Sequence, residues 1–338
     1  MSLAIGVGHV LPIGDEMLYQ QTHDTGRSQT SSIVLRDIDR DLDGRLTDRY
    51  GINAVAKWSP DGQQIAYVTL NDTLFHVYVM DALGKNKRQL PLEFTTLDSG
   101  YVWSPDSQYI LFSVSVKGIP QSLILKVASG QTYMLPQAIG LGMWSPHSKN
   151  IIYQASTENG TPHLYGININ CFEQSQPCQF EELNILRNQA FNDIPSWSPD
   201  GHAIAFNEYN YGNSKIIVAV LRCVDLVEAC VERYAVIGQG YGTSSPIWSA
   251  NGNNLAFISG TSEMTIVQLA TRETRTYLTP NIMSDLKDWS PTGQFIGYFS
   301  IRTGEINVYL LDTVGGESHP LFLNQITNEL PEWRPNPH

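Results

Sequence analysis

The stretch WSPDGQQIAY at residues 58–67 decides the fold, because copies of it recur along the whole chain. Later copies read WSPDSQYILF from Trp103, WSPHSKNIIY from Trp144, WSPDGHAIAF from Trp197, WSANGNNLAF from Trp248 and WSPTGQFIGY from Trp289. A last tryptophan, Trp333, begins the C-terminal sequence WRPNPH. These seven are all the tryptophans of the 338-residue chain, and they are spaced by 41 to 53 residues. The chain is therefore an array of one repeating unit.

Each copy predicts a strand that ends at the tryptophan, a tight turn and a second strand. In the sequence Ser-Pro-Asp-Gly, proline fixes φ, aspartate bonds to its own backbone and glycine accepts a positive φ. Two further extended segments follow each copy, such as FHVYVM at 75–80 and KRQLPL at 87–92. Four short strands in a unit of this length are typical of a β-propeller blade. Because a tryptophan recurs in every unit, we expect these side chains to pack between neighbouring sheets.

We therefore predict an all-β fold, a seven-bladed propeller of four-stranded antiparallel blades that forms a single domain over residues 1–338. Six complete blades start at the first six tryptophans, and residues 1–14 are a lead-in. The seventh blade is split, with strands from residues 15–50 and a last strand from residues 328–334. Such a blade joins the two chain ends and removes a sheet edge. Six or eight blades are the alternatives.

The repeated WSPDG-x-x-IAF unit resembles the propeller repeat of TolB-like proteins and of prolyl-oligopeptidase-type peptidases, and the resemblance covers nearly the whole chain. It implies a propeller and favours a protein partner in the cell envelope. The chain departs from both groups: the α/β domain and six blades of TolB are not recognisable, and there is neither room for a hydrolase domain nor a G-x-S-x-G motif. The resemblance therefore supports the prediction of the fold more strongly than any prediction of the function.

Charge and hydropathy narrow the class of partner. Acids outnumber bases by 33 to 21, which gives a formal net charge of −12. This balance argues against nucleic acid or an anionic membrane as the main partner. No apolar run reaches the 18 residues needed to suggest a membrane span.

The four cysteines form two pairs of identical spacing, Cys171 with Cys178 and Cys223 with Cys230. In the strand map each pair flanks the hairpin between the third and fourth strands of a blade, where two cysteines can lie within disulfide range. Free thiols, or one zinc site shared by all four, are the alternatives. Disulfides and the low content of Lys and Arg favour a periplasmic or secreted protein.

Polar residues recur at the start of the tryptophan-bearing strands, five and four positions before the tryptophan. Because these strands are innermost, their first residues should surround the central channel, where a ring of acids would attract a cation, a metal or a basic peptide. Ordinary strand-start chemistry is the simpler interpretation. The candidate binding residues are Asn53, Asp98, Asn192, Asp193, Asp285, Asn328 and Glu329.

Two further candidates lie in loops. Tyr209, Tyr211 and Tyr241 occur in loops of the same face, amid Gly and Asn, and could form a binding patch or stack on sugar rings. Residues 37–46, DIDRDLDGRL, place Asp39, Asp41 and Asp43 before a glycine, like the first half of a calcium loop. The twelfth position from Asp39 holds tyrosine instead of glutamate, and an ordinary hairpin is the alternative.

From the sequence we expect a non-catalytic binding scaffold that recognises a protein partner through the channel mouth at the start of the inner strands, with no cofactor unless calcium binds. One alternative is a metal-dependent enzyme resembling polysaccharide lyases, with Asp98, Asp193, Asp285, Glu329 and His163 as ligands. Another is a carbohydrate-binding module that uses the three tyrosines.

Overall fold

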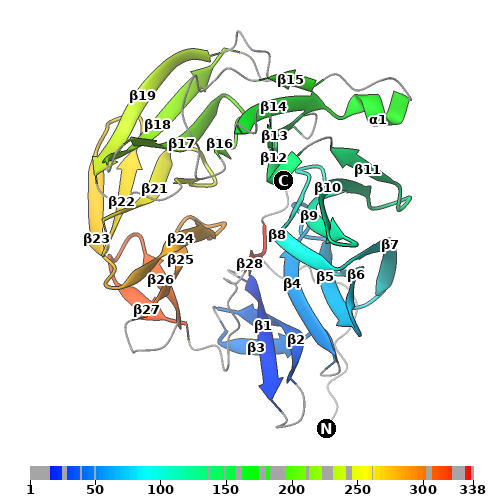
Figure 1. Cartoon of the computed structure of the whole chain (residues 1–338). Helices are drawn as coiled ribbons and strands as arrows, with labels where there is room; N and C mark the ends of the chain where they lie inside the picture. The colour runs from blue at the N-terminus through cyan, green and yellow to red at the C-terminus, as the bar shows by residue number, and fades with distance from the viewer. Residues whose placement is uncertain are drawn as a thin grey trace.

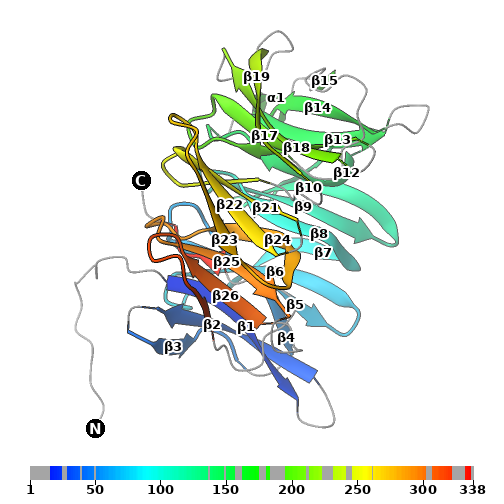
Figure 2. The same cartoon turned by 90° about the vertical axis from the view of Figure 1, so that its left-hand side faces the viewer.

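The computed structural model describes the chain in segments. These are residues 16–24, 29–38, 40–48, 51–135, 138–147, 150–156, 162–174, 180–182, 195–210, 213–222, 231–240, 246–260, 262–301, 307–321 and 332–335. Within them the chain is all-β except for one short helix, α1 (Asn170–Gln174). The sheets stand side by side around a common axis, and Figures 1 and 2 show this ring from two directions.

Five of the sheets are separate four-stranded antiparallel blades. Their strands are β8 (Thr96–Trp103), β9 (Tyr109–Val116), β10 (Ile119–Lys126) and β11 (Thr132–Leu135); β12 (Ala138–Trp144), β13 (Asn150–Ser156), β14 (Pro162–Asn168) and β15 (Phe180–Glu182); β16 (Ser196–Trp197), β17 (Ala203–Asn210), β18 (Asn213–Leu221) and β19 (Val231–Gly240); β20 (Ile247–Trp248), β21 (Asn254–Ser259), β22 (Glu263–Gln268) and β23 (Thr274–Leu278); β24 (Ile282–Trp289), β25 (Phe295–Ser300), β26 (Asn307–Asp312) and β27 (Ser318–Pro320). The tryptophan-bearing strands lie nearest the axis, and β11, β19, β23 and β27 lie outside (Figure 1).

The prediction of seven separate blades is wrong, because the structure has five. The remaining strands form one eight-stranded sheet. They are β1 (Glu16–Asp24), β2 (Gln29–Asp37), β3 (Leu42–Arg45), β4 (Ile52–Trp58), β5 (Gln64–Asn71), β6 (Leu74–Asp81), β7 (Arg88–Phe94) and β28 (Glu332–Trp333). The physical reason is a parallel pairing of β2 with β4 at Ser31 and Ile52, which fuses the N-terminal strands with those of the first repeat.

Side-chain hydrogen bonds reinforce this fusion. The Ser31 hydroxyl donates to the Asn53 carbonyl at 2.8 Å, and the Asn53 side-chain amide donates to the Ser31 carbonyl at 2.9 Å. Both residues are buried, so the two bonds form away from competing water. The sequence pattern of the repeat carries no signal for this contact.

The two ends of the described chain meet in the same sheet. β28 pairs antiparallel with β1, with Met17 opposite Trp333 and Leu18 opposite Glu332. The Arg334 backbone N–H adds a bond to the Glu16 carbonyl at 2.7 Å. The pairing covers an edge of β1 that would otherwise be open to other strands.

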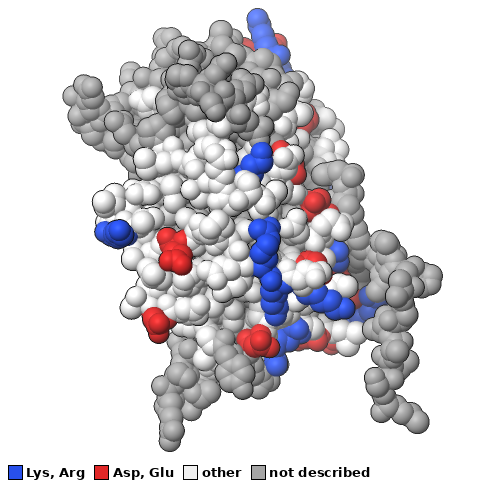
Figure 3. All heavy atoms as spheres, turned by 90° about the vertical axis from the view of Figure 1, so that its right-hand side faces the viewer, with Lys and Arg blue, Asp and Glu red and all other residues white. Residues whose placement is uncertain are grey.

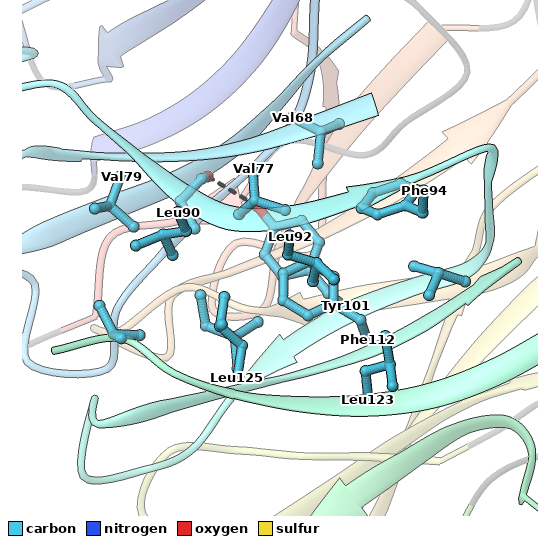
Figure 4. Packing of buried hydrophobic residues seen from close by; sticks show 14 of the residues in the cluster. Val68, Val77, Val79, Leu90, Leu92, Phe94, Tyr101, Phe112, Leu123 and Leu125 are labelled. Atoms are coloured by element: carbon cyan, nitrogen blue, oxygen red, sulfur yellow. Dashed lines mark hydrogen bonds between the residues drawn. The ribbon is translucent and has the colours of Figure 1, made fainter. Parts of the chain in front are cut away.

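The core consists of apolar layers between neighbouring sheets. Outer strands alternate: in β7, Leu90, Leu92 and Phe94 are buried, while the residues between them are exposed. The second strand of a blade is covered on both faces, as in β9, where all residues except the last are buried. The largest layer lies between β5–β7 and β8–β10, and Figure 4 shows its side chains meeting across the gap between the two sheets.

Among the described residues, no helix is long and apolar enough to cross a membrane.

Candidate functional site

Each tryptophan leads into a turn whose geometry follows from its sequence. In the first repeat the Ser59 hydroxyl donates to Asp61 at 2.6 Å and accepts the Gln64 backbone N–H at 2.9 Å. Gly62 has a φ of 66°, a conformation that side chains disfavour. The same serine–carboxylate bond recurs at Ser104 and at Ser198, each at 2.6 Å. The repeated sequence therefore fixes where each inner strand ends.

The tryptophans join neighbouring inner strands. The indole N–H of Trp103 donates to the Lys57 carbonyl at 3.3 Å, that of Trp144 to the Val102 carbonyl at 3.4 Å, and that of Trp248 to the Ser196 carbonyl at 3.1 Å. In each case the acceptor is the residue just before the tryptophan of the preceding repeat. This bonding, with the burial of these rings, confirms that the tryptophans pack between neighbouring sheets.

A cavity of about 660 Å³ lies where the inner strands end. Its walls are mostly tryptophan and proline, and among the described lining residues Glu332 is the one with a charge. The lining comprises Trp58, Pro60, Ser196, Trp197, Pro199, Ile247, Trp248, Ala250, Trp289, Pro291, Glu332, Trp333 and Pro335. Residues from five of the seven tryptophan repeats therefore meet at one opening near the axis of the ring.

Arg334 follows β28, between the lining residues Trp333 and Pro335. Its guanidinium donates to the Glu16 carboxylate at 2.6 Å and lies 4.9 Å from the centroid of the Trp58 ring. The ion pair neutralises Arg334 locally, and Glu332 is the charged residue among the described lining residues. Cations are attracted both to carboxylates and to indole rings. The cavity can thus accept apolar groups and a basic group.

Two lining tryptophans depart from the regular bonding. The indole N–H groups of Trp58 and Trp197 are buried and have no hydrogen-bond partner in the structure. An unsatisfied buried donor costs about 1–3 kcal/mol. The indole bond between neighbouring inner strands is therefore present at Trp248 of the lining and missing at Trp58 and Trp197.

Of the residues predicted for the acidic ring at the other end of the inner strands, the structure describes the side chains of Asn53 and Asp98. Asn53 is buried, and its side chain accepts the Thr69 hydroxyl at 3.0 Å besides bonding Ser31, so it holds strands together. Asp98 is exposed, but both of its oxygens are engaged: Thr96 donates to one at 2.7 Å and Ser115 to the other at 2.8 Å. The structure does not bring these two side chains into a common site.

The other predicted residues of that face lie outside what the structure describes. Asp285 is in β24 and Tyr209 is in β17, but neither side chain is among those described, and the same holds for His163 in β14. Positions entirely outside the described residues are Asn192, Asp193, Asn328, Glu329, Tyr211 and Tyr241. The acidic ring and the tyrosine patch therefore stay predictions.

The predicted calcium loop contains the hairpin between β2 and β3. Arg36 donates to Asp41 and also to Asp43, the latter at 3.1 Å, so both carboxylates share one guanidinium. Asp43 lies beside Tyr19, whose pKa is raised to about 12, first by burial and then by this carboxylate. Asp39 lies outside the described residues. In the part of the chain that is described, no three His, Cys, Asp or Glu residues gather as a metal site would need.

Of the four cysteines predicted to form two disulfides, the structure describes one. Cys171 is half-buried in α1, whereas Cys178, Cys223 and Cys230 lie outside the described residues. The two disulfides accordingly stay predictions.

The cavity lies at the opposite end of the inner strands from the predicted acidic ring, which stays a prediction. The repeat itself contained the signal: tryptophan, serine and proline recur where the inner strands end, so these residues had to gather around the axis. A tryptophan that recurs in every repeat predicts packing between sheets, but the same residue can also line the space where the sheets converge.

The family is identified by comparison with known proteins. The family model of the TolB beta propeller domain matches residues 21–171 and 180–338. A curated relative, the uncharacterized protein Atu1656 of Agrobacterium fabrum, is 24% identical over 159 residues, which are 45% of this chain and 53% of the relative. The chain thus spans about half the length of the relative it matches.

Three solved structures share the fold at low identity. TolB from Acinetobacter baumannii gives a TM-score of 0.58 at 17% identity, over 95% of this chain and 67% of the other. The β-propeller domain of the Trilobed protease from Pyrococcus furiosus gives 0.63 at 15%, over 94% and 96%. Oligogalacturonate lyase from Vibrio parahaemolyticus gives 0.61 at 11%, over 84% and 83%. Because the family model covers nearly the whole chain, this chain belongs to the TolB beta propeller domain family.

Proposed function

We propose that this chain is a non-catalytic binding scaffold of the cell envelope or the secreted space, and that it holds a segment of a protein partner in the axial cavity. The observation that carries the proposal is the cavity of about 660 Å³ lined by tryptophan and proline. Ligand sites usually occupy about 300–1,000 Å³ and are mostly apolar, with a few polar groups. Family membership supports a binding role, because the propeller fold serves recognition in many proteins.

The chemistry of the lining favours a polypeptide segment with an apolar or basic side chain. Rigid aromatic and proline walls lose little conformational entropy when they bind, which lowers the cost of recognition. The tryptophans would cover apolar carbon, and their rings would also attract a basic group. Family membership and the predicted disulfides support an envelope or secreted location, since disulfides persist in oxidising compartments.

A substitution that fills the cavity tests this proposal. Ala250 lines the cavity in the turn after β20, and Phe in its place would occupy the space of the bound segment. Ala270 is exposed in the turn between β22 and β23 of the same blade and does not line the cavity, so Ala270→Phe is the matched control. Both variants would be used beside the wild type for affinity capture from an envelope extract of the source organism.

We expect a protein that the wild type and Ala270→Phe retain, and that Ala250→Phe retains about tenfold less, equivalent to about 1.4 kcal/mol. Equal retention by Ala250→Phe would exclude the cavity as the binding site. The metal-dependent alternative stays a prediction, and metal analysis of the purified protein would test it separately.

A further inference from the structure

Basic side chains gather on one hairpin of this acidic protein. The turn between β6 and β7, together with the first residue of β7, reads GKNKR at residues 84–88, and Lys85, Lys87 and Arg88 are all exposed. The whole chain has a net charge of −12, so three cations within four residues are a local reversal of its charge. Figure 3 shows the side of the propeller that carries β6, β7, β10 and β11, where Lys and Arg side chains form a run across the surface.

A fourth cation joins from the neighbouring blade. The Arg88 guanidinium donates to the Val127 carbonyl at 3.1 Å, which places it beside the turn that follows β10. Lys126 ends β10, and its ammonium lies 5.5 Å from the centroid of the Tyr109 ring. We name Lys85, Lys87, Arg88 and Lys126 the basic hairpin surface. It spans the junction between the eight-stranded sheet and the next blade.

This surface stands on a rigid base. Asp81 accepts the backbone N–H groups of Leu83 at 3.0 Å and Lys85 at 2.8 Å, and also the Asn86 side chain at 2.8 Å, so its oxygens are used in shaping the turn. Below it, Leu90, Leu92 and Leu125 belong to the largest apolar layer between sheets (Figure 4). The backbone that carries the cations is therefore held in place, which lowers the entropy that the turn loses on binding.

An exposed apolar side chain accompanies the charges. Leu83, at the tip of the same hairpin, is 70% exposed. Arg88 offers the planar fork that pairs with a carboxylate, while the lysines supply point charges on flexible stems. A surface of this composition fits a short segment that carries carboxylates and one apolar residue.

We propose that the basic hairpin surface docks an acidic segment of a protein partner. A short segment can be matched by these four cations, whereas an extended polyanion such as nucleic acid or an anionic membrane would also face many of the acids that give the chain its net charge of −12. The surface is separate from the axial cavity, so this inference stands or fails independently of the proposed function.

A fluorescent eight-residue peptide of Asp and Glu with one central Leu is the probe, and its binding to the whole protein is measured by fluorescence anisotropy. The test variant is Lys85→Gln/Lys87→Gln, which spares Arg88 and its bond to the Val127 carbonyl. The matched control is Arg272→Gln/Arg275→Gln, which removes the same charge from exposed positions of the β22–β23 hairpin. Thermal unfolding of both variants checks that each is folded.

We expect the Kd of the peptide to rise about tenfold in the lysine variant and less than about twofold in the arginine control. The wild-type Kd should also rise with salt, because screening weakens exposed charge pairs. Ala250→Phe should bind the peptide as the wild type does. An unchanged Kd in the lysine variant, or an equal loss in the control, would overturn the proposal. Tighter, lysine-dependent binding to a DNA oligonucleotide or to phosphatidylglycerol vesicles would also overturn it in favour of a polyanion.

Discussion

Single polar side chains determine the turns on which the propeller is built. Ser198 donates to Asp200 at 2.6 Å, and Asp200 accepts the His202 backbone N–H at 3.0 Å. In the next repeat Asn251 takes the same place, accepting from Ser249 at 2.8 Å and from the Asn253 N–H at 3.0 Å. The turn therefore needs an acceptor oxygen at this position, but it forms whether or not that side chain carries a negative charge.

Because asparagine can replace the acceptor but cannot titrate, Asp200→Asn should change how the free energy of unfolding depends on pH. Burial acts to raise the pKa of Asp200, but the bonds from Ser198 and the His202 N–H outweigh it and lower the pKa below 3.8. A lowered folded-state pKa contributes stability above the unfolded pKa, and that contribution is lost as pH falls through the folded pKa. Between pH 5 and pH 3 the wild type should thus lose more unfolding free energy than the variant, as urea titrations would show.

The control is Asn251→Asp, which should add the acid-dependent loss that Asp200→Asn removes. If Asp200→Asn and the wild type lost stability in parallel over this pH range, the charge of Asp200 would have no role in the turn.

At the scale of elements, neighbouring hairpins are fitted to one another by small residues. Gly130 has a φ of 75°, and a Cβ added there would lie 2.5 Å from Cγ of Pro91 in the adjacent sheet. Gly118 has a nearly equal φ of 77°, but a Cβ there would meet nothing within 4 Å. An alanine at either position would have a strained backbone, but only an alanine at position 130 would also clash with a neighbour.

Gly130→Ala should therefore destabilise the protein more than Gly118→Ala. Strain alone should cost about 1–2 kcal/mol, since alanine at this φ is disfavoured. The clash with Pro91 should add about 1–3 kcal/mol, because the rigid proline ring must move. Chemical denaturation measures both values. Equal losses in the two variants would mean that the hairpins do not press on each other at Gly130.

Strand positions could be predicted from the sequence where the repeat governs them. The turn after Trp58 and the alternation in β7 follow from local chemistry and side-chain period. The fusion of β2 with β4 could not be predicted, because it depends on Ser31 meeting Asn53, a contact specific to this part of the chain. The sequence signal of Asn53 is equally ambiguous. A polar residue at the start of a strand can bind a ligand or can hydrogen-bond a neighbouring strand, as Asn53 does.

At the scale of the molecule, the two chain ends are joined by a short strand and one ion pair. Arg334 bonds Glu16 at 2.6 Å, with the two side chains 22% and 19% exposed, and it also donates to the Gly62 carbonyl at 3.3 Å. The β1–β28 ladder itself contains two residue pairs. Arg334 is therefore placed to hold the end of the chain against the first strand.

Arg334→Gln should cost about 1–3 kcal/mol, because it leaves the Glu16 carboxylate without its partner. It should also speed amide exchange at Met17 and Leu18, which face β28. Lys215→Gln is the control, since Lys215 lies 3.8 Å from Glu208 and is 45% exposed. That pair should contribute no more than about 1 kcal/mol. Unchanged exchange in β1 of Arg334→Gln would show that the ladder holds the closure alone.

The cavity, too, is a property of the whole molecule. Its walls come from inner strands far apart in sequence, so no local pattern marks it as a pocket. Acidic positions near the start of those strands can be recognised in a sequence by their charge. The convergence of tryptophan and proline on one opening depends instead on how the sheets are arranged around the axis.

We propose that the propeller binds its partner at the end of the inner strands. The most direct test places the photo-crosslinking residue p-benzoylphenylalanine at position 250 in the cavity, at 270 on the same blade outside it, and at 98 near the start of an inner strand. After irradiation in an envelope extract, we expect a protein adduct from position 250 and none from positions 98 or 270. An adduct from position 98 without one from position 250 would contradict it.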